Sequence, residues 1–353
     1  MFGFMRIIQY FLLQKSTIDT PPNHIVVRTA APHMHNNYFR LFNQSAKKDM
    51  FIYIDCFDKN QFTKIKRLKF WDIFSEFYLT LLEGIPIISK LSKDEGRFQI
   101  ACQAMRLMPV FSYFTCLLKN LKNKNSNIKI FSGGADLISA SAIVSNVETY
   151  WLAHGLIDPA NLVGSRNIKP DPSKYFIAYP DFDYVYLYSQ DEAEYLKDHG
   201  VSSELRLYPY KKLDNLNKKI IIFLNDEDRN MNFRDLEELV KFFKKHGFEI
   251  IMKLHPSYKG TLRHKFLNDQ MIRIIKDSSP SASELMTGER PRFVSGWLST
   301  TLCEAYRLGI IPICLAKPED SIYSPYKFNT KSIYWGEEKK IIKDFISNKN
   351  NFF

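Results

Sequence analysis

The chain has 353 residues, which exceeds what one hydrophobic core usually supports and suits two domains. Hydrophobic residues make up 45% and charged residues 25% of the sequence, a composition that excludes an intrinsically disordered chain. The net charge of +11 favours anionic partners such as phosphorylated small molecules, nucleic acid or anionic lipid.

The five cysteines are scattered and form no C-x-x-C pair, so we expect neither a zinc site nor a disulfide framework, and a reducing compartment fits. No apolar run has the length of a membrane span. The apolar stretch at the N-terminus is broken by Arg6 and Gln9, and no small-residue cleavage site follows it. We therefore expect a short amphipathic or buried helix there and not a secretory signal.

Short apolar runs alternate with helical patterns along the first half of the chain. Residues 70–84 carry apolar side chains three or four positions apart, which predicts one buried helical face, and Gly84 is placed to end that helix. That face consists of Phe70, Ile73, Phe74, Phe77, Tyr78, Leu81 and Leu82. Further helices are expected over 97–122 and 191–200. Strands are expected at 24–29, 50–55, 128–134, 149–155, 184–189 and 205–210.

The polar, lysine-rich segment 211–219 is interpreted as a domain linker, after which the alternation restarts. Strands are then expected at 220–226, 249–256, 271–277, 292–297 and, as the last strand, 310–315, and helices at 233–247, 281–288 and 299–309. Alternation over both halves predicts an α/β fold with two doubly wound, Rossmann-like domains facing a cleft, 1–212 and 213–353. The tail beyond Ser321 is poorly patterned and is free to cross back to the first domain.

Ligands of open α/β sheets bind at the carboxyl ends of the strands, so the residues that follow each strand are the candidates for ligand binding. One strand ends in Lys253-Leu254-His255-Pro256, and the helix after another strand starts with Ser299-Thr300-Thr301. The plain interpretation is that Pro256 stops the strand and that Ser299 is only a helix N-cap. Cations, free helix N–H groups and hydroxyls also suit phosphate. Because both stretches belong to neighbouring strands of one domain, we favour a phosphate site.

Three more residues accompany these strand exits. Glu304, one turn into the helix, either accepts hydrogen bonds from ribose hydroxyls or is a solvated helix residue. His154 and Gly155 follow a strand of the first domain, where Gly155 permits a close approach to a ligand and His154 suits a general base or a phosphate contact. The motifs of P-loop ATPases, dinucleotide-binding enzymes, zinc proteases and α/β-hydrolases are absent.

The H-G pair at 154–155, the K-x-H-P stretch at 253–256 and S-T-T-x-x-E-A-x-x-x-G at 299–309 resemble bacterial GT-B glycosyltransferases. They are most similar to the groups that build capsule or lipooligosaccharide from CMP-activated sugars: sialyltransferases, polysialyltransferases and Kdo-transferases. The resemblance covers residues 130–350. It implies a donor such as CMP-activated sialic acid or a Kdo-like sugar, and a surface-glycan or glycolipid acceptor. It also implies that His255, Pro256, Ser299 and Thr300 bind the nucleotide phosphate.

The chain departs from the sialyltransferase pattern at the general base. Those groups carry the base in an acidic D/E-D/E-G motif, and the only such string here is Asp94-Glu95-Gly96, where Ser92 and Glu95 equally form a helix capping box. At the strand exit where that motif is expected, this chain has His154-Gly155. We therefore interpret His154 as the base, with Glu95 and Asp136 as alternatives.

Two further alternatives share these residues. The H-G and K-x-H-P stretches also resemble the polyol-phosphate transferases that use CDP-glycerol in teichoic-acid synthesis. A non-catalytic GT-B relative that serves as an assembly partner would have the same sequence features. A nucleic-acid-binding module lacks its usual basic recognition motifs, so no nucleic-acid partner is expected. No Asp-x-Asp string occurs, and protein cations with helix dipoles stabilise a leaving phosphate, so neither a metal nor another cofactor is expected.

The segment 64–71, KIKRLKFW, places four cations beside Phe70 and Trp71. Such a pattern predicts a cytoplasmic protein that contacts the anionic inner face of the cell membrane peripherally. The alternative is a solvated helix start whose apolar residues all face the core.

Overall fold

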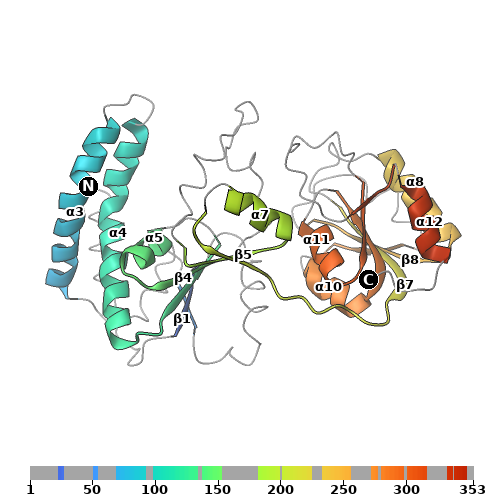
Figure 1. Ribbon diagram of the computed structural model, residues 1–353, viewed down its shortest axis with the longest axis horizontal. Helices are drawn as coiled ribbons and strands as arrows, with labels where there is room; N and C mark the ends of the chain where they lie inside the picture. Colours follow the sequence, from blue (N-terminus) through green and yellow to red (C-terminus); the bar gives the residue numbers. More distant parts are fainter. Residues whose placement is uncertain are drawn as a thin grey trace. The chain divides into compact units, whose positions relative to one another are not determined.

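A computed structural model of the chain describes residues 23–27, 51–54, 69–92, 98–133, 137–152, 182–198, 201–224, 233–255, 272–276, 280–297, 300–315, 332–336 and 338–347 (Figure 1). The chain divides into two compact units. The first contains strands β1 to β6. The second contains strands β7 to β12 and also the short segment Tyr188–Tyr195.

The first unit is built on a six-stranded sheet in the order β2-β1-β3-β4-β5-β6, and every neighbouring pair is parallel. Its strands are β1 (His24–Val27), β2 (Phe51–Ile54), β3 (Lys129–Ser132), β4 (Glu148–Leu152), β5 (Tyr184–Leu187) and β6 (Glu204–Leu207). This is a doubly wound order in which the chain reverses direction across the sheet between β1 and β3.

The two faces of the first sheet differ because side chains alternate along each strand. One face packs Ile25 and Ile130 against the helices of this unit, with Phe114 among them. These helices are α3 (Phe70–Ser92), α4 (Phe98–Lys124) and α5 (Leu137–Val144); α3 and α4 lie side by side (Figure 1). On the other face, aromatic rings stack across the strands. The ring centroids of Tyr150 and Tyr184 lie 4.7 Å apart.

Helix α3 differs from its prediction in two ways. It continues through Gly84 to Ser92, and Gly84 lies against α4: a Cβ there would lie 2.6 Å from Cε of Met108. The predicted buried face was also wrong in part. Ile73 is buried, whereas Phe74, Tyr78 and Leu82 are exposed. Helix α5, which the sequence analysis missed, is only eight residues long.

The second unit has a six-stranded parallel sheet in the order β12-β11-β10-β7-β8-β9. Its strands are β7 (Asn217–Phe223), β8 (Glu249–Lys253), β9 (Ile272–Ile275), β10 (Pro291–Gly296), β11 (Ile311–Cys314) and β12 (Ile333–Tyr334). Read in chain order, this is the Rossmann order of strands. The two sheets confirm the predicted α/β class with two doubly wound, Rossmann-like sheets.

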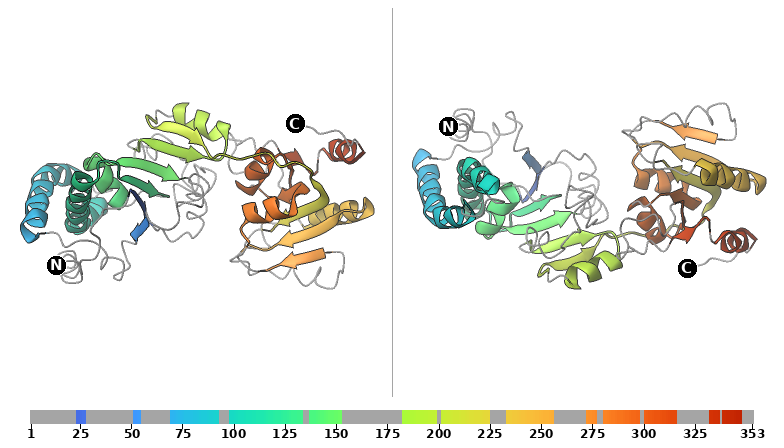
Figure 2. Two further views of the ribbon diagram at one scale, coloured as in Figure 1. Left: turned by 90° about the horizontal axis from the view of Figure 1, so that it is seen from below. Right: turned by 90° about the horizontal axis from the view of Figure 1, so that it is seen from above.

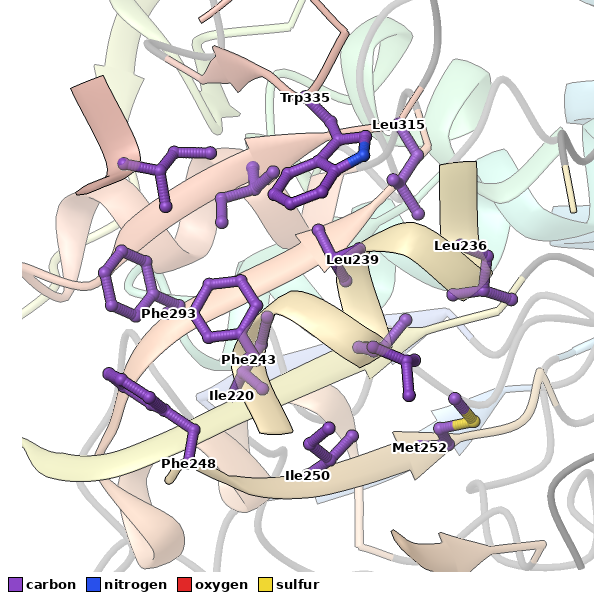
Figure 3. Close-up of a cluster of buried hydrophobic side chains, with 14 of the residues drawn as sticks. Ile220, Leu236, Leu239, Phe243, Phe248, Ile250, Met252, Phe293, Leu315 and Trp335 are labelled. Atoms are coloured by element: carbon purple, nitrogen blue, oxygen red, sulfur yellow. The ribbon is translucent and has the colours of Figure 1, made fainter. Parts of the chain in front are cut away.

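Helices cover both faces of the second sheet (Figure 2). They are α8 (Phe233–Lys245) and α12 (Lys339–Ser347) on one face, and α10 (Ala282–Glu289) and α11 (Thr300–Arg307) on the other. The core under α8 is rich in aromatic rings, and Phe243 packs edge-on against both Phe248 and Phe293 (Figure 3). Such edge-to-face contacts add to the free energy gained by burial.

The described part of the tail contains a strand and a helix that the sequence pattern did not predict. The run 310–315 is not the last strand, because the two-residue strand β12 pairs with β11 and helix α12 follows it. Ile342 and Phe345 of α12 are buried in the core under α8. The described part of the tail therefore packs on the second unit.

The segment interpreted as a linker also packs on the second unit. The N–H of Leu213 donates a hydrogen bond of 2.8 Å to the carbonyl oxygen of Leu308, and Leu216 lies against the core under α10 and α11. Strand β7 begins within the segment, at Asn217. Its polar composition reflects a partly exposed position along the surface of the unit.

Candidate functional site

The carboxyl edge of the second sheet brings together several of the predicted site residues. Strands β7 and β10 are neighbours, and the chain leads away from them to opposite sides of the sheet. Such a switch point is where open α/β sheets bind ligands. Strand β7 lies between β8 and β10, so the expectation that the two predicted stretches follow neighbouring strands was wrong. The described residues of both stretches nevertheless lie at the same edge.

Lys253 is the last residue of β8 and is buried, with 5% of its surface exposed. It is paired in register with Phe223 at the end of β7. Because side chains alternate along a strand, Lys253 shares a face with Ile251, which packs under α10 and α11. A buried ammonium group is costly unless anions or acceptors face it. Because it ends a strand at the carboxyl edge of the sheet, Lys253 is a candidate for anion binding.

His255 lies two residues beyond Lys253 and is exposed. Between them Leu254 is buried, and its N–H donates a hydrogen bond of 3.0 Å to the carbonyl oxygen of Ile275. The main chain is thus still held to the neighbouring strand β9 one residue before His255. An exposed imidazole next to a buried lysine offers hydrogen-bond donors to a ligand at this edge.

Gly296 is the last residue of β10, beside the end of β7. A Cβ at Gly296 would lie 3.3 Å from the carbonyl oxygen of Phe223, so the missing side chain allows the two strand ends to approach each other. Helix α11 starts four residues later at Thr300, and both Thr300 and Thr301 are partly buried. The N–H groups of its first turn, which have no partner within the helix, lie at the same edge of the sheet.

Glu304 is buried in α11, which rules out a solvated helix residue and leaves the ribose-binding interpretation open. Its neighbour Cys303 is a buried free thiol. Burial raises the pKa of Cys303, and the carboxylates of Glu192, Asp191 and Glu304 raise it further. The thiol therefore stays protonated and is no nucleophile at neutral pH.

Glu192 and Arg307 are charged residues of this unit that the sequence analysis missed. The Glu192 carboxylate is fully buried and accepts hydrogen bonds from the N–H groups of Tyr188 and Ser189, at 2.9 and 2.8 Å. The guanidinium of Arg307 donates to the carbonyl oxygen of Tyr188 at 3.3 Å and lies over the ring of Tyr210. Burial lowers the pKa of Arg307.

These contacts attach the segment Tyr188–Tyr195 to α11. The local signal was present in the sequence. Ser189 and Glu192 have the S-x-x-E spacing of a capping box at the start of α7 (Gln190–Asp198), and both of its hydrogen bonds are formed. The contact between Arg307 and Tyr188 has no such signal, because these two residues lie far apart in the chain.

Six predicted site residues lie outside the described residues. They are Glu95, Asp136, His154, Gly155, Pro256 and Ser299. Their roles stay predictions. The described members of the predicted set are Lys253, His255, Thr300, Thr301 and Glu304.

A pocket of about 740 Å³ opens at the amino-terminal edge of the first sheet. Its lining includes Asn146, Glu148, Thr149, Asp183, Tyr184 and Glu204. The carboxylates have protein partners: Asp183 accepts a hydrogen bond of 2.7 Å from the N–H of Thr149, and Glu204 pairs with Arg206 at 2.7 Å. The Asp183 contact joins the amino end of β4 to the residue before β5, whereas Glu204 and Arg206 belong to the same strand, β6.

No protein-family model matches the chain, and no curated protein sequence is similar to it. Among solved structures, the chain is similar to UDP-GlcNAc 2-epimerase from Methanocaldococcus jannaschii, with 12% identity, coverage of 93% of each chain and a TM-score of 0.49. It is also similar to UDP-GlcNAc 2-epimerase from Neisseria meningitidis bound to UDP-GlcNAc, with 12% identity, coverage of 86% and 84%, and a TM-score of 0.43.

A third similar structure is UDP-glucose:anthocyanidin 3-O-glucosyltransferase in complex with UDP, with 9% identity, coverage of 84% of this chain and 81% of that chain, and a TM-score of 0.41. At TM-scores below 0.5 such similarities identify neither a substrate nor an activity.

Proposed function

We propose that the protein is a glycosyltransferase that takes its sugar from a nucleotide donor, and that the nucleotide binds at the carboxyl edge of the second sheet. The observation that carries this proposal is the position of Lys253. A buried lysine ends β8 one strand away from the switch point, at the same edge where Gly296 lets two strands meet and α11 begins. That combination suits a diphosphate or monophosphate group.

Each residue of the edge has a distinct role in the proposal. The Lys253 ammonium and the His255 imidazole neutralise the phosphate as the bond to the sugar breaks. The hydroxyls of Thr300 and Thr301 and the N–H groups of the first turn of α11 donate hydrogen bonds to it. Glu304 accepts hydrogen bonds from the ribose hydroxyls. The resemblance in sequence adds Pro256, Ser299 and Gly155 to this set.

The first unit is proposed to bind the acceptor. A base on that unit removes a proton from the acceptor hydroxyl while the anomeric bond to the nucleotide breaks. His154 is our candidate, with Glu95 and Asp136 as alternatives. Water must be kept from the donor during this step, since it would otherwise take the place of the acceptor.

We further propose a CMP-activated donor, such as sialic acid or a Kdo-like sugar, and a glycan or glycolipid acceptor of the cell surface. The support is the K-x-H-P and S-T-T stretches and their order in the chain. The nucleotide-sugar is a co-substrate, and the proposed mechanism needs no metal and no other cofactor, because cations and helix N–H groups of the chain stabilise the leaving phosphate. The proposed location is the cytoplasmic face of the cell membrane.

A thermal-shift series with CMP, CDP, UDP and GDP tests the nucleotide assignment, because a ligand that binds only the folded state raises the melting temperature. We expect the largest rise with CMP, in the presence and absence of EDTA. A preference for CDP, with release of CMP from CDP-glycerol, would indicate the polyol-phosphate transferase alternative. No shift with any of the four nucleotides, and no hydrolysis of a nucleotide-sugar, would contradict the proposal and favour a non-catalytic partner.

A further inference from the structure

One side of helix α3 is covered with large apolar side chains that face solvent. Between 45% and 71% of each side chain's surface is exposed, and Trp71 has the highest value. We call this set the apolar face of α3, and it consists of Trp71, Phe74, Tyr78, Leu79, Leu82 and Ile85. Exposed apolar side chains are normal when single, but a contiguous set marks an interaction surface.

The apolar face is an uninterrupted stripe. At about 100° per residue, its six members fall within roughly 140° of the helix circumference, and Trp71 to Ile85 span roughly 20 Å along the axis. The other residues of α3 in that sector are Ser75, Pro86, Ser89 and Ser92, none of which is charged; the first three are exposed. The acidic residues Asp72 and Glu83 lie at the margin of the sector and not within it.

The packing of α3 on α4 fixes this orientation. On the opposite side of α3, Ile73 is buried and Gly84 lies against Met108 of α4. Glu76, beside that interface, forms an ion pair of 2.8 Å with Lys119 of α4. Turning the apolar face toward the core would break these contacts. Its exposure therefore belongs to the folded unit.

The sequence next to α3 indicates what covers the face. Lys64, Lys66, Arg67 and Lys69 immediately precede the helix, and the whole chain carries a net charge of +11. A helix with an apolar stripe that includes Trp and Tyr, next to a cluster of cations, has the composition of an interfacial membrane helix. None of the helices in the described ranges is long and apolar enough to cross a membrane.

We propose that the apolar face of α3 docks onto the surface of an anionic lipid bilayer, with the exposed Lys69 at the headgroups. A second copy of the chain would present the same positive charge and lacks this complementarity. The surface gives a physical basis for peripheral attachment, and it does not depend on which donor the second unit binds.

Tryptophan fluorescence of the full-length protein tests the contact directly. Of the four tryptophans, Trp71 is exposed, whereas Trp151, Trp297 and Trp335 are buried. Vesicles containing phosphatidylglycerol should shift the emission to shorter wavelength, and brominated lipid should quench it; phosphatidylcholine vesicles should have a much weaker effect. Trp71→Phe should abolish the change while the protein still sediments with the anionic vesicles.

Substitutions within and outside the face complete the test. Tyr78→Glu with Leu82→Glu should reduce partitioning onto anionic vesicles at least tenfold, and circular dichroism should show an unchanged fold because both side chains are exposed. The matched control is Val144→Glu, an equally exposed apolar position in α5, which should bind normally. Equal partitioning of the two variants would overturn the proposal. So would a dimer that dissociates in the Tyr78/Leu82 variant, if the unmodified protein does not bind vesicles.

Discussion

A methyl group in place of a hydrogen on Gly296 would lie 3.3 Å from the main-chain carbonyl oxygen of Phe223, at the point where β10 ends beside β7. This contact is tighter than ordinary van der Waals distance, and its partner is backbone that cannot move aside as a side chain can. A larger residue at this position would push the two strand ends apart by a few tenths of an ångström.

Gly296→Ala should accordingly lower the free energy of unfolding by about 1–2 kcal/mol, because the strand ends must separate to admit the methyl group. Urea denaturation measures the change. Gly288→Ala is the matched control: no atom lies within 4 Å of a Cβ there, and the residue is inside helix α10. Alanine should be neutral or stabilising by up to about 1 kcal/mol at that position. Equal stabilities of the two variants would contradict this account of Gly296.

Lys253→Met should keep the fold and weaken nucleotide binding. Methionine has a similar shape without the charge, so the core under α10 and α11 stays filled. Loss of a charge-assisted hydrogen bond to phosphate should cost roughly 1.5–3 kcal/mol, measured by calorimetry with CMP. Lys241→Met, on the exposed side of α8, should leave the affinity unchanged. An unaltered affinity in Lys253→Met would remove the lysine from the proposed site.

His154→Asn should separate catalysis from binding. If His154 is the base, the variant binds nucleotide normally and loses roughly a hundredfold or more in turnover. A weaker nucleotide affinity would instead indicate a phosphate contact. The comparison set is Glu95→Gln and Asp136→Asn. A normal rate in His154→Asn with a collapse in one of these two would assign the base to that carboxylate.

Glu289 predicts a pH dependence of stability. Its carboxylate joins two strands by ion pairs, with Lys219 at 2.7 Å and with Arg273. The hydrogen bond from Lys219 lowers the pKa of Glu289. A carboxylate with a lowered pKa stabilises the fold above its unfolded-state pKa of about 4.3, and this contribution is lost as the pH falls through the lower folded-state value.

Glu289→Gln should therefore reduce the free energy of unfolding by roughly 1 kcal/mol at pH 7. The difference from the unmodified protein should shrink as the pH drops below about 4. Urea titrations across this pH range measure it, and Glu83→Gln, an exposed position of α3, controls for the change in net charge. A deficit that stays constant down to acid pH would show that the ion pairs are not its cause.

Ser295 tests a buried hydroxyl. Its Oγ atom is fully buried in β10 and has no hydrogen-bond partner within the described part of the chain. Ser295→Ala should be neutral or stabilising by about 1 kcal/mol, since it removes a polar group that lost its water on folding. Ser141→Ala should cost about 1 kcal/mol, because that equally buried hydroxyl donates a hydrogen bond of 3.2 Å to the carbonyl oxygen of Phe111. Melting temperatures measure both changes, and we expect Ser295→Ala to melt at a higher temperature than Ser141→Ala. A Ser295→Ala variant that is less stable than the unmodified protein would contradict this account of its hydroxyl.

The alternation of strands and helices was predictable because it depends on local periodicity. The expected helices at 233–247 and 299–309 correspond to α8 and α11, which end two residues before Gly247 and Gly309, and both glycines adopt positive φ. Lys253 was found at a strand end for the same reason, since an apolar run followed by a cation is visible without tertiary information. Strand β12 was not predicted, because two residues are too few to show a period.

Which elements become neighbours is decided by contacts between residues that are distant in the chain. Gly84 looks like a helix end in the sequence, yet it lies inside α3, where Met108 of another helix packs against it. Periodicity located the apolar residues of α3, but the pattern does not show which side of the helix packs against a partner. Likewise, β7 separates β8 from β10, and Lys253 is buried because helices cover that face of the sheet. The residue types at the edge come from the sequence; their burial and proximity come from tertiary packing, because pairing and burial depend on surfaces that meet only after the chain folds.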